Sequence, residues 1–334
     1  MLTPYELKGI TIPNRIVMPA MCQYTATEDG LAVDWHLIHY GSRAVGGVGL
    51  IILEATAVEK RGRLSNHDLG VWDDDQIEGL REIANFCRAR GSVVGIQIAH
   101  AGRKAWGEDL VAPSAIPFPK RAVPKALTIA EIRTVVENWR QGARRANKAG
   151  FDLLEVHAAH GYLIHEFLSP LSNRRTDEYG GTFEKRLHLL LEIVAAVQEE
   201  WPREKLLAVR LSAVDFLDGG LTLADTVKIG GRLKEAGVDL IDVSSGGLLP
   251  AEIELYPGYQ VPYAAAVKKE VRIPTIAVGL ITGAELVREI VANERADFVA
   301  LGRELLRNPY WVLENSADVD DWPRQYERAA PERS

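Results

Sequence analysis

Two histidines and a tyrosine stand close together in the segment His157-Ala-Ala-His160-Gly-Tyr162. Imidazole and phenol side chains can donate hydrogen bonds and transfer protons to a bound molecule. The segment follows an apolar run, residues 152–156, that is typical of a buried strand, and a polar, glycine-punctuated run, residues 169–181, comes after it. Loops carry function more often than packing, so the pattern predicts a chemical site where this strand ends.

The two histidines allow a second chemistry, because a pair with this spacing also suits a zinc ion. The residue types alone leave metal ligation and hydrogen bonding as open alternatives. A catalytic zinc ion needs a third protein ligand, and the chain has further histidines that could supply it. These are His36, His39, His67, His100 and His165.

The elements that must position these groups follow a regular alternation. Eight short runs are apolar throughout, which indicates strands buried on both faces, as in a parallel sheet. They cover residues 15–18, 48–53, 93–98, 152–156, 206–210, 239–243, 275–278 and 297–301. Segments with helical periodicity lie between them, at residues 75–90, 128–149, 182–200, 222–236 and 282–293. In the second of these, Thr128 and Glu131 have the spacing of a capping box, and Gly150 is placed to end the helix.

Eight strands that alternate with helices predict an α/β fold, specifically a (β/α)8 TIM barrel. An open dinucleotide-binding sheet is disfavoured, because no G-x-G-x-x-G pattern follows the first strand. Residues 2–12 are expected to form a small hairpin around Lys8-Gly9 that closes the barrel floor. No linker divides the chain, so we expect one domain over residues 1–334, with a C-terminal tail from about residue 315.

Composition narrows the class of protein. The chain has 334 residues, 47% of them hydrophobic, and a net charge of −7 with both signs interspersed, which argues against a nucleic-acid partner. No apolar run is long enough to span a membrane, and the N-terminus does not resemble a signal peptide. The two cysteines, Cys22 and Cys87, are too few for a four-cysteine metal site and indicate a reducing compartment, by default the cytoplasm.

In such a barrel the active site lies at the carboxyl ends of the strands. Reading the residues at those ends in chain order gives one candidate set. It comprises Pro19, Ala20, Met21, Cys22 and Tyr24, then Glu54 and Ala55, Gln97 and His100, His157, His160 and Tyr162, Arg210, Ser244 to Gly247, Gly279, and Gly302 with Arg303.

Part of this set points to a phosphorylated aromatic cofactor. Gly279, Gly302 and Arg303 match the usual phosphate site of a barrel, where backbone N–H groups and a guanidinium bind the anion. The amide of Gln97 can pair with a pyrimidine-like edge, and Arg210 can stabilise a developing anion. Flavin mononucleotide, FMN, has all of these parts. Taken singly, Arg210 could instead pair with a carboxylate such as Asp215, and Cys22 could be a core thiol.

At this point the chain resembles the Old Yellow Enzyme family of FMN ene-reductases, in particular its bacterial thermophilic-like subclass. The matching motifs span most of the chain, and the strand-four motif is the most specific of them. They are residues 14–24, 95–104, 157–181, 258–260 and 301–305.

The resemblance implies roles for the matching positions around FMN. Pro19, Ala20, Met21 and Cys22 would line the flavin, with Cys22 beside its reactive edge, where it tunes the redox potential. Ala55, Gln97 and Arg210 would contact the ring system. Gly279, Gly302 and Arg303 would bind the phosphate.

The resemblance also implies the reaction. NADPH or NADH would reduce FMN and leave, and an activated alkene would then enter the same site, a ping-pong cycle. His157 and His160 would hold the carbonyl or nitro oxygen while hydride passes from FMN N5 to the β carbon. Tyr162 would give a proton to the α carbon, and Tyr24 would contact the substrate from the opposite side.

In this subclass an arginine near the C-terminus enters a neighbouring active site, and Gln325-Tyr-Glu-Arg328 matches that motif. The resemblance therefore implies a homodimer or homotetramer in which Arg328 is shared. Three rival classes remain: a metal-dependent barrel hydrolase, a flavin-binding protein without turnover, and a relative of the larger dienoyl-CoA reductases. The third needs an iron–sulfur cluster, and two cysteines argue against it.

Overall fold

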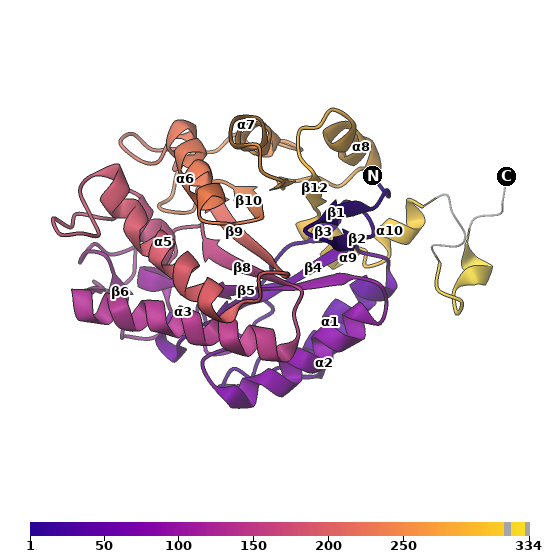
Figure 1. The fold of residues 1–334 in the computed structure, drawn as a ribbon, viewed down its shortest axis with the longest axis horizontal. Coiled ribbons are helices and arrows are strands. Elements are labelled where there is room, and N and C mark those ends of the chain that lie inside the picture. The colour runs from indigo at the N-terminus through magenta and orange to yellow at the C-terminus, as the bar shows by residue number, and fades with distance from the viewer. Residues whose placement is uncertain (317–321, 331–334) are drawn as a thin grey trace.

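The computed structural model describes residues 1–316 and 322–330 of the chain, and its centre is a closed barrel of parallel strands (Figure 1). The eight strands follow one another around the barrel in chain order, and the last of them pairs with the first. They are β3 Ile16–Met18, β4 Leu50–Ala57, β5 Val93–Ala99, β8 Leu153–Ala158, β9 Leu206–Ser212, β10 Leu240–Ser244, β11 Thr275–Ala277 and β12 Phe298–Ala300. The predicted (β/α)8 barrel and each of its eight strands are confirmed.

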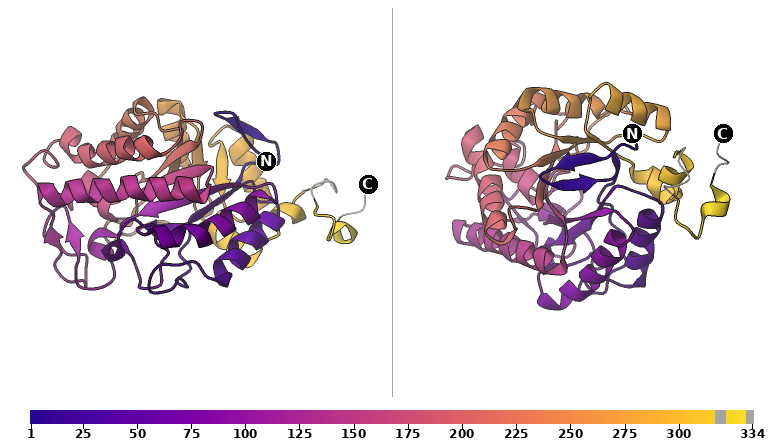
Figure 2. Two further views of the ribbon diagram at one scale, coloured as in Figure 1. Left: turned by 60° about the horizontal axis from the view of Figure 1, so that its bottom comes forward. Right: turned by 45° about the vertical axis from the view of Figure 1, so that its right-hand side comes forward.

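Helices surround the barrel on its outer face (Figures 1 and 2). The larger ones are α1 Asp34–Val45, α2 Ile77–Arg88, α3 Ile129–Ala149, α5 Phe183–Glu200, α6 Leu223–Glu235, α7 Val261–Val271 and α8 Ala284–Ala292. Shorter elements at the ends of the barrel strands are α4 Leu163–Leu168, α9 Gly302–Arg307, α10 Trp311–Glu314 and the strand pair β6 Val111–Ala112 and β7 Lys125–Ala126. The capping box of Thr128 and Glu131 is present at α3, and Gly150 ends that helix with a left-handed φ of 91°.

Two of these helices, α1 and α7, were not predicted from the sequence. In neither helix does the side chain of the N-cap residue accept a hydrogen bond from a backbone N–H of the first turn. Val33 precedes α1, and its N–H donates instead to Nδ1 of His36, one turn into the helix. Helix α7 has Pro262 in its first turn, where the missing N–H costs nothing. A side-chain cap, the strongest signal of a helix start, is therefore absent from both segments.

A hairpin formed by β1 Tyr5–Leu7 and β2 Ile10–Ile12 covers the amino end of the barrel (Figure 2). Its two-residue turn has positive φ at both Lys8 and Gly9, which is the geometry of the favoured hairpin turns. Ile12 joins the apolar cluster that fills the barrel floor, and the Tyr5 ring lies edge-on to Phe298 with centroids 5.0 Å apart. The predicted closure of the floor is confirmed.

Strand register decides which polar side chains become neighbours inside the barrel. Gln97 on β5 is paired with Glu155 on β8, and His157 on β8 is paired with Arg210 on β9. Arg210 is in turn paired with Asp242 on β10. Four adjacent strands thus bring a row of polar groups to the carboxyl half of an otherwise apolar barrel. In the described part of the chain, no helix is long and apolar enough to cross a membrane.

Candidate active site

The segment from His157 to Tyr162 turns sharply where β8 ends. His160 and Gly161 both have left-handed φ values, 58° and 70°, and a Cβ at Gly161 would collide with the backbone of Gly247. The turn places Tyr162 at the start of α4 and brings the three rings together. The His157 ring centroid lies 4.9 Å from that of Tyr162 and 5.2 Å from that of His160.

Both histidines of this cluster are neutral imidazoles. Burial lowers the pKa of His157 and of His160 well below the usual range, and the positive charge of Arg210 adds to the effect. A neutral imidazole carries one proton, so only one of its nitrogens can donate a hydrogen bond. In His157 the backbone N–H of Ala159 donates to Nδ1 at 3.2 Å, which leaves the proton on Nε2. His157 is therefore held as a hydrogen-bond donor through Nε2.

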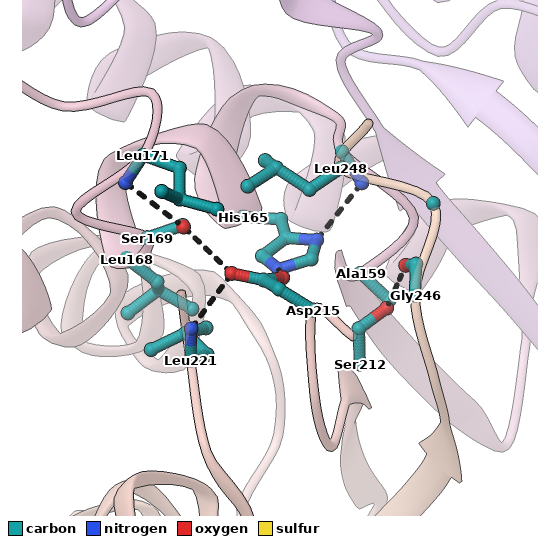
Figure 3. Close-up of polar contacts among 12 residues, drawn as sticks. Ala159, His165, Leu168, Ser169, Leu171, Ser212, Asp215, Leu221, Gly246 and Leu248 are labelled. Atoms are coloured by element: carbon teal, nitrogen blue, oxygen red, sulfur yellow. Dashed lines mark hydrogen bonds and ion pairs between the residues drawn. The ribbon is translucent and has the colours of Figure 1, made fainter. Parts of the chain in front are cut away.

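A buried network behind the turn holds it in place (Figure 3). The N–H of Gly161 donates to His165 Nδ1 at 2.9 Å, and His165 Nε2 donates to Asp215 Oδ1 at 2.9 Å. Ser169 Oγ and the N–H of Leu221 donate to the other carboxylate oxygen, each at 2.7 Å. Burial alone would raise the pKa of Asp215, but these hydrogen bonds outweigh it and lower the pKa. His165 therefore has a structural role beneath the cluster.

Arg210 lies between the buried carboxylates of Asp242 and Glu155. Its Nε is 3.0 Å from Asp242 Oδ2, and both side chains are more than 90% buried. The alternative pairing of Arg210 with Asp215 is wrong, because Asp215 is engaged by His165. Burial, reinforced by the charge of Asp242, raises the pKa of Glu155, and burial likewise raises the pKa of Asp242.

Gln97 completes this group. Its Nε2 donates to Glu155 Oε1 at 2.6 Å, which leaves the amide oxygen and the second N–H free to pair with a pyrimidine edge. Glu155 Oε2 and Asp242 Oδ1 are buried without a hydrogen bond among the described residues, whereas Arg210 Nε and Asp242 Oδ2 have only their ion pair with each other. Orphaned polar atoms of this kind mark a place where a polar ligand binds. Sequence reasoning missed Glu155 and Asp242, although an acidic residue inside an apolar strand is a usable signal.

The segment after β3 brings Cys22 and Tyr24 to the same end of the barrel. Glu54 fixes this segment by accepting a 2.6 Å hydrogen bond from the N–H of Gln23. Burial raises the pKa of the Cys22 thiol, and the carboxylates of Asp68 and Glu54 add to the shift, so Cys22 is a protonated thiol. Tyr24 interacts with this thiol and is 55% exposed. Ala55 and Tyr162 line one narrow cavity together with Asp68.

A second cavity, of about 250 Å³, opens at the carboxyl ends of β11 and β12. Gly279 has a φ of 128°, and a Cβ there would lie 3.1 Å from the backbone nitrogen of Gln260. The guanidinium of Arg303 has no hydrogen-bond or ion-pair partner among the described residues. The cavity lining includes Arg210, Ser244, Tyr259, Gln260, Gly279, Gly302, Arg303 and Arg307.

The two cavities and the orphaned polar row fit FMN. An unpaired arginine beside close-approach glycines suits a phosphate, and Gln97 with Arg210 suits the polar edge of the ring. Pro19 and Met21 lie next to this cavity, because a Cβ at Gly302 would meet Met21 Sδ at 3.5 Å and Pro19 Cγ at 3.9 Å. The predicted flavin contacts from β3, β4, β5, β9, β11 and β12 therefore converge on one end of the barrel.

The zinc alternative lacks a ligand set in the part of the chain that the structure describes, where no three His, Cys, Asp or Glu side chains are arranged to hold a metal ion. Three of the further histidines face carboxylates instead. His36 lies 3.3 Å from Glu54, His100 Nε2 lies 2.6 Å from Glu59, and His165 is bound to Asp215.

Arg328 is not brought to the histidine cluster within this chain. It is exposed in a short 3-10 helix, Glu327–Ala329, that lies apart from the barrel beyond α10 (Figure 1). In the described part of the tail, the Tyr326 ring packs against the ring of Tyr310, the residue before α10, with centroids 5.8 Å apart. Residues 317–321 and 331–334 of the predicted tail lie outside the described residues.

A closed parallel barrel with a cavity that suits a phosphate, and with this row of polar groups, fits a flavin-binding oxidoreductase of the TIM-barrel type. The model of the NADH:flavin oxidoreductase / NADH oxidase family matches residues 1–320. The chain belongs to this family, the Old Yellow Enzyme group of proteins, and is an FMN-dependent NAD(P)H oxidoreductase.

Individual relatives agree with this assignment. The chain is 54% identical to a protein named NADPH dehydrogenase from Geobacillus thermodenitrificans, over 98% of each chain. Among solved structures it is similar to morphinone reductase, with a TM-score of 0.81 and 29% identity over 99% of this chain and 90% of that one. An Old Yellow Enzyme homologue from Zymomonas mobilis has a TM-score of 0.81 and 27% identity, over 99% and 93% of the two chains.

Proposed function

We propose that this protein uses NADPH to reduce the activated C=C bond of α,β-unsaturated carbonyl or nitro compounds. One observation carries the proposal: two neutral imidazoles, His157 and His160, adjoin a protonated phenol, Tyr162, where β8 ends. Neutral donors can hold a carbonyl or nitro oxygen, and withdrawal of electron density through that oxygen activates the alkene. The names of the curated relatives favour NADPH over NADH as the donor.

One set of residues binds the cofactor in this proposal, and another set binds the substrate. When bound, FMN would supply the hydride chemistry that couples oxidation of NADPH to reduction of the alkene. We assign cofactor binding to Pro19, Ala20, Met21, Cys22, Ala55, Gln97, Arg210, Gly279, Gly302 and Arg303. His157 and His160 bind the substrate oxygen, Tyr24 faces the substrate from the other side, and Cys22 adjusts the potential as a thiol.

Tyr162 is the proton donor to the α carbon in this proposal. Burial raises the pKa of its phenol, so the group keeps its proton across the physiological range. It lies beside His157 and away from the phosphate-binding cavity, as a group that serves the substrate must.

Purification under non-denaturing conditions tests the function directly. We expect a yellow protein that releases FMN on denaturation and consumes NADPH when 2-cyclohexenone is added without oxygen, with cyclohexanone as the product. A colourless preparation that contains zinc would refute the proposal and favour a hydrolase. A yellow preparation that does not oxidise NADPH would instead favour a flavin-binding protein without turnover.

We further propose that residues 1–334 form one FMN-binding domain and that the tail reaches a neighbouring subunit of a homodimer or homotetramer. Exposure of Arg328 and of Tyr326 away from the barrel supports this role. Cys22 and Cys87 are both free thiols, which supports the proposed placement in the reducing cytoplasm.

Replacing Arg328 with alanine is expected to lower kcat/KM for the alkene roughly tenfold, because a charge-assisted contact to the substrate is lost. Mixed oligomers, co-expressed with a Tyr162→Phe chain and isolated through two different tags, should regain activity above the mean of the two parents. Only a site that combines Tyr162 of one subunit with Arg328 of the next can produce that gain. Mixed oligomers at or below the mean would remove the shared site.

A further inference from the structure

His160 depends on its neighbours to become a hydrogen-bond donor. Its Nε2 lies 2.7 Å from Ser244 Oγ, so the nitrogen left for a ligand is Nδ1. Ser244 lies at the end of β10, and its Oγ also lies 3.2 Å from Gln260 Oε1. Because His160 is neutral, one proton must be shared between its two nitrogens, and the hydroxyl of Ser244 has one proton for two acceptors.

These contacts allow two arrangements with opposite consequences. In the first, His160 Nε2–H donates to Ser244, Ser244 donates to Gln260, and the bare Nδ1 repels a carbonyl oxygen. In the second, Ser244 donates to His160 Nε2, and Nδ1 carries the proton and can donate to that oxygen. The direction of one serine hydroxyl therefore decides whether His160 binds or repels a substrate oxygen.

We propose that Ser244 is a positioning residue that holds His160 in its Nδ1–H tautomer and so makes it a donor to the acceptor oxygen. This inference rests on the function proposed above. It assigns to β10 a residue that selects substrates without touching them.

The hydrogen bonds around Gln260 favour the second arrangement. Its Oε1 already accepts a 2.6 Å hydrogen bond from Ser245 Oγ, whereas Ser244 is more distant at 3.2 Å. The contact of Ser244 with His160 is the shorter of its two, and an O–H group that donates makes short hydrogen bonds.

The backbone around His160 is fixed well enough for this contact to be specific. The N–H of His160 donates to Ser212 Oγ on β9 at 2.9 Å, and Ser212 Oγ donates to the carbonyl of Gly246 at 2.8 Å (Figure 3). Lys104 Nζ donates to the carbonyl of His160 at 2.8 Å and also contacts the carbonyl of Gly247. Ser244 itself is in register with Ser212 in the barrel sheet.

The two histidines thus differ in what fixes their protons. The tautomer of His157 is set by the N–H of Ala159, which every residue type except proline would supply. The tautomer of His160 is set by a side chain, so substitution at position 244 can change it. This difference makes the proposal testable.

The first measurement is of the tautomer itself. In FMN-loaded protein labelled with ¹⁵N-histidine, and with the His160 signals identified by their loss in His160→Gln, we expect Nδ1 to carry the proton. Ser244→Thr, which keeps the hydroxyl, should preserve this state, and Ser244→Ala should lose it. Ser245→Ala is the matched control, because it removes a hydroxyl bound to Gln260 but not to His160. A proton on Nε2 in the unchanged protein, or no change in Ser244→Ala, would overturn the proposal.

The second measurement compares two unreactive ligands through their effect on the flavin absorption band. Cyclohexanone can only accept hydrogen bonds, whereas phenol can also donate one to a bare Nδ1. In the FMN-loaded fraction of the protein, Ser244→Ala should therefore weaken cyclohexanone binding on the order of tenfold, and phenol binding much less. Equal weakening of both ligands would show general damage to the pocket and would count against the proposal. If the unchanged protein binds neither ligand, the proposed function fails, while the tautomer measurement still decides the role of Ser244.

Discussion

A Tyr162→Phe enzyme is expected to be reduced by NADPH at nearly the normal rate and to reduce an enone about 10²- to 10⁴-fold more slowly. In the proposed function the phenol of Tyr162 is the proton donor; it lies beside His157, and burial keeps it protonated by raising its pKa. Hydride transfer from NADPH requires no proton from this group. Phenylalanine keeps the ring and its contact with His157, so the change removes the proton and little else.

Anaerobic stopped-flow absorbance can separate the two half-reactions of this variant. Ferricyanide provides an internal control, because it takes electrons without needing a proton at carbon and should reoxidise the variant at the normal rate. A similar loss in both half-reactions would contradict the proton-donor role and would point to a distorted pocket.

Replacing His157 and His160 together with alanine is expected to weaken the binding of enones and phenols about 10²- to 10³-fold while FMN stays bound. In the proposed function each neutral imidazole would donate one hydrogen bond to the substrate oxygen, and two such bonds have an effect of this order. The proposed FMN contacts come from other strands, at Gln97, Arg210 and Arg303.

Ligand titration followed through the flavin spectrum measures this effect, and FMN released on denaturation gives the cofactor content. His188→Ala is a suitable control, because that histidine is partly exposed on α5 and lies outside the candidate site. Loss of FMN from the double variant, with ligand affinity retained in the remaining holoenzyme, would show that the two histidines belong to the cofactor site.

The barrel could be predicted from the sequence because its signals are local. Continuous apolar runs located all eight strands, and the capping box at Thr128 located the start of α3. Helices α1 and α7 escaped prediction because Val33 and Gln260, the residues before them, form no side-chain cap. A helix start can thus be predicted from the sequence where a nearby side chain caps it, as at Thr128.

The site was only partly predictable, because its pairings depend on strand register. The sequence suggested Asp215 as a partner for Arg210, whereas register places Asp242 beside it and gives Asp215 to His165. The contact of His160, in the loop after β8, with Ser244, on β10, cannot be predicted from the spacing of these residues in the sequence. Predicted roles at strand ends could be listed from the sequence, but their partners required the three-dimensional fold.

Closure of the barrel also has a consequence for the order in which the chain can fold. Ile16 on β3 pairs with Val299 on β12, and Tyr5 of the hairpin rests on Phe298, so these contacts join opposite ends of the sequence. During synthesis the edge of β3 that pairs with β12, and the face of the hairpin that contacts Phe298, therefore stay without their partners until almost the whole chain has emerged. Pairing over such a separation is slow, because loop-closure entropy must be overcome before any contact forms. We therefore expect closure of the floor to come late in folding, and the edge of β3 to be open to misassociation until then.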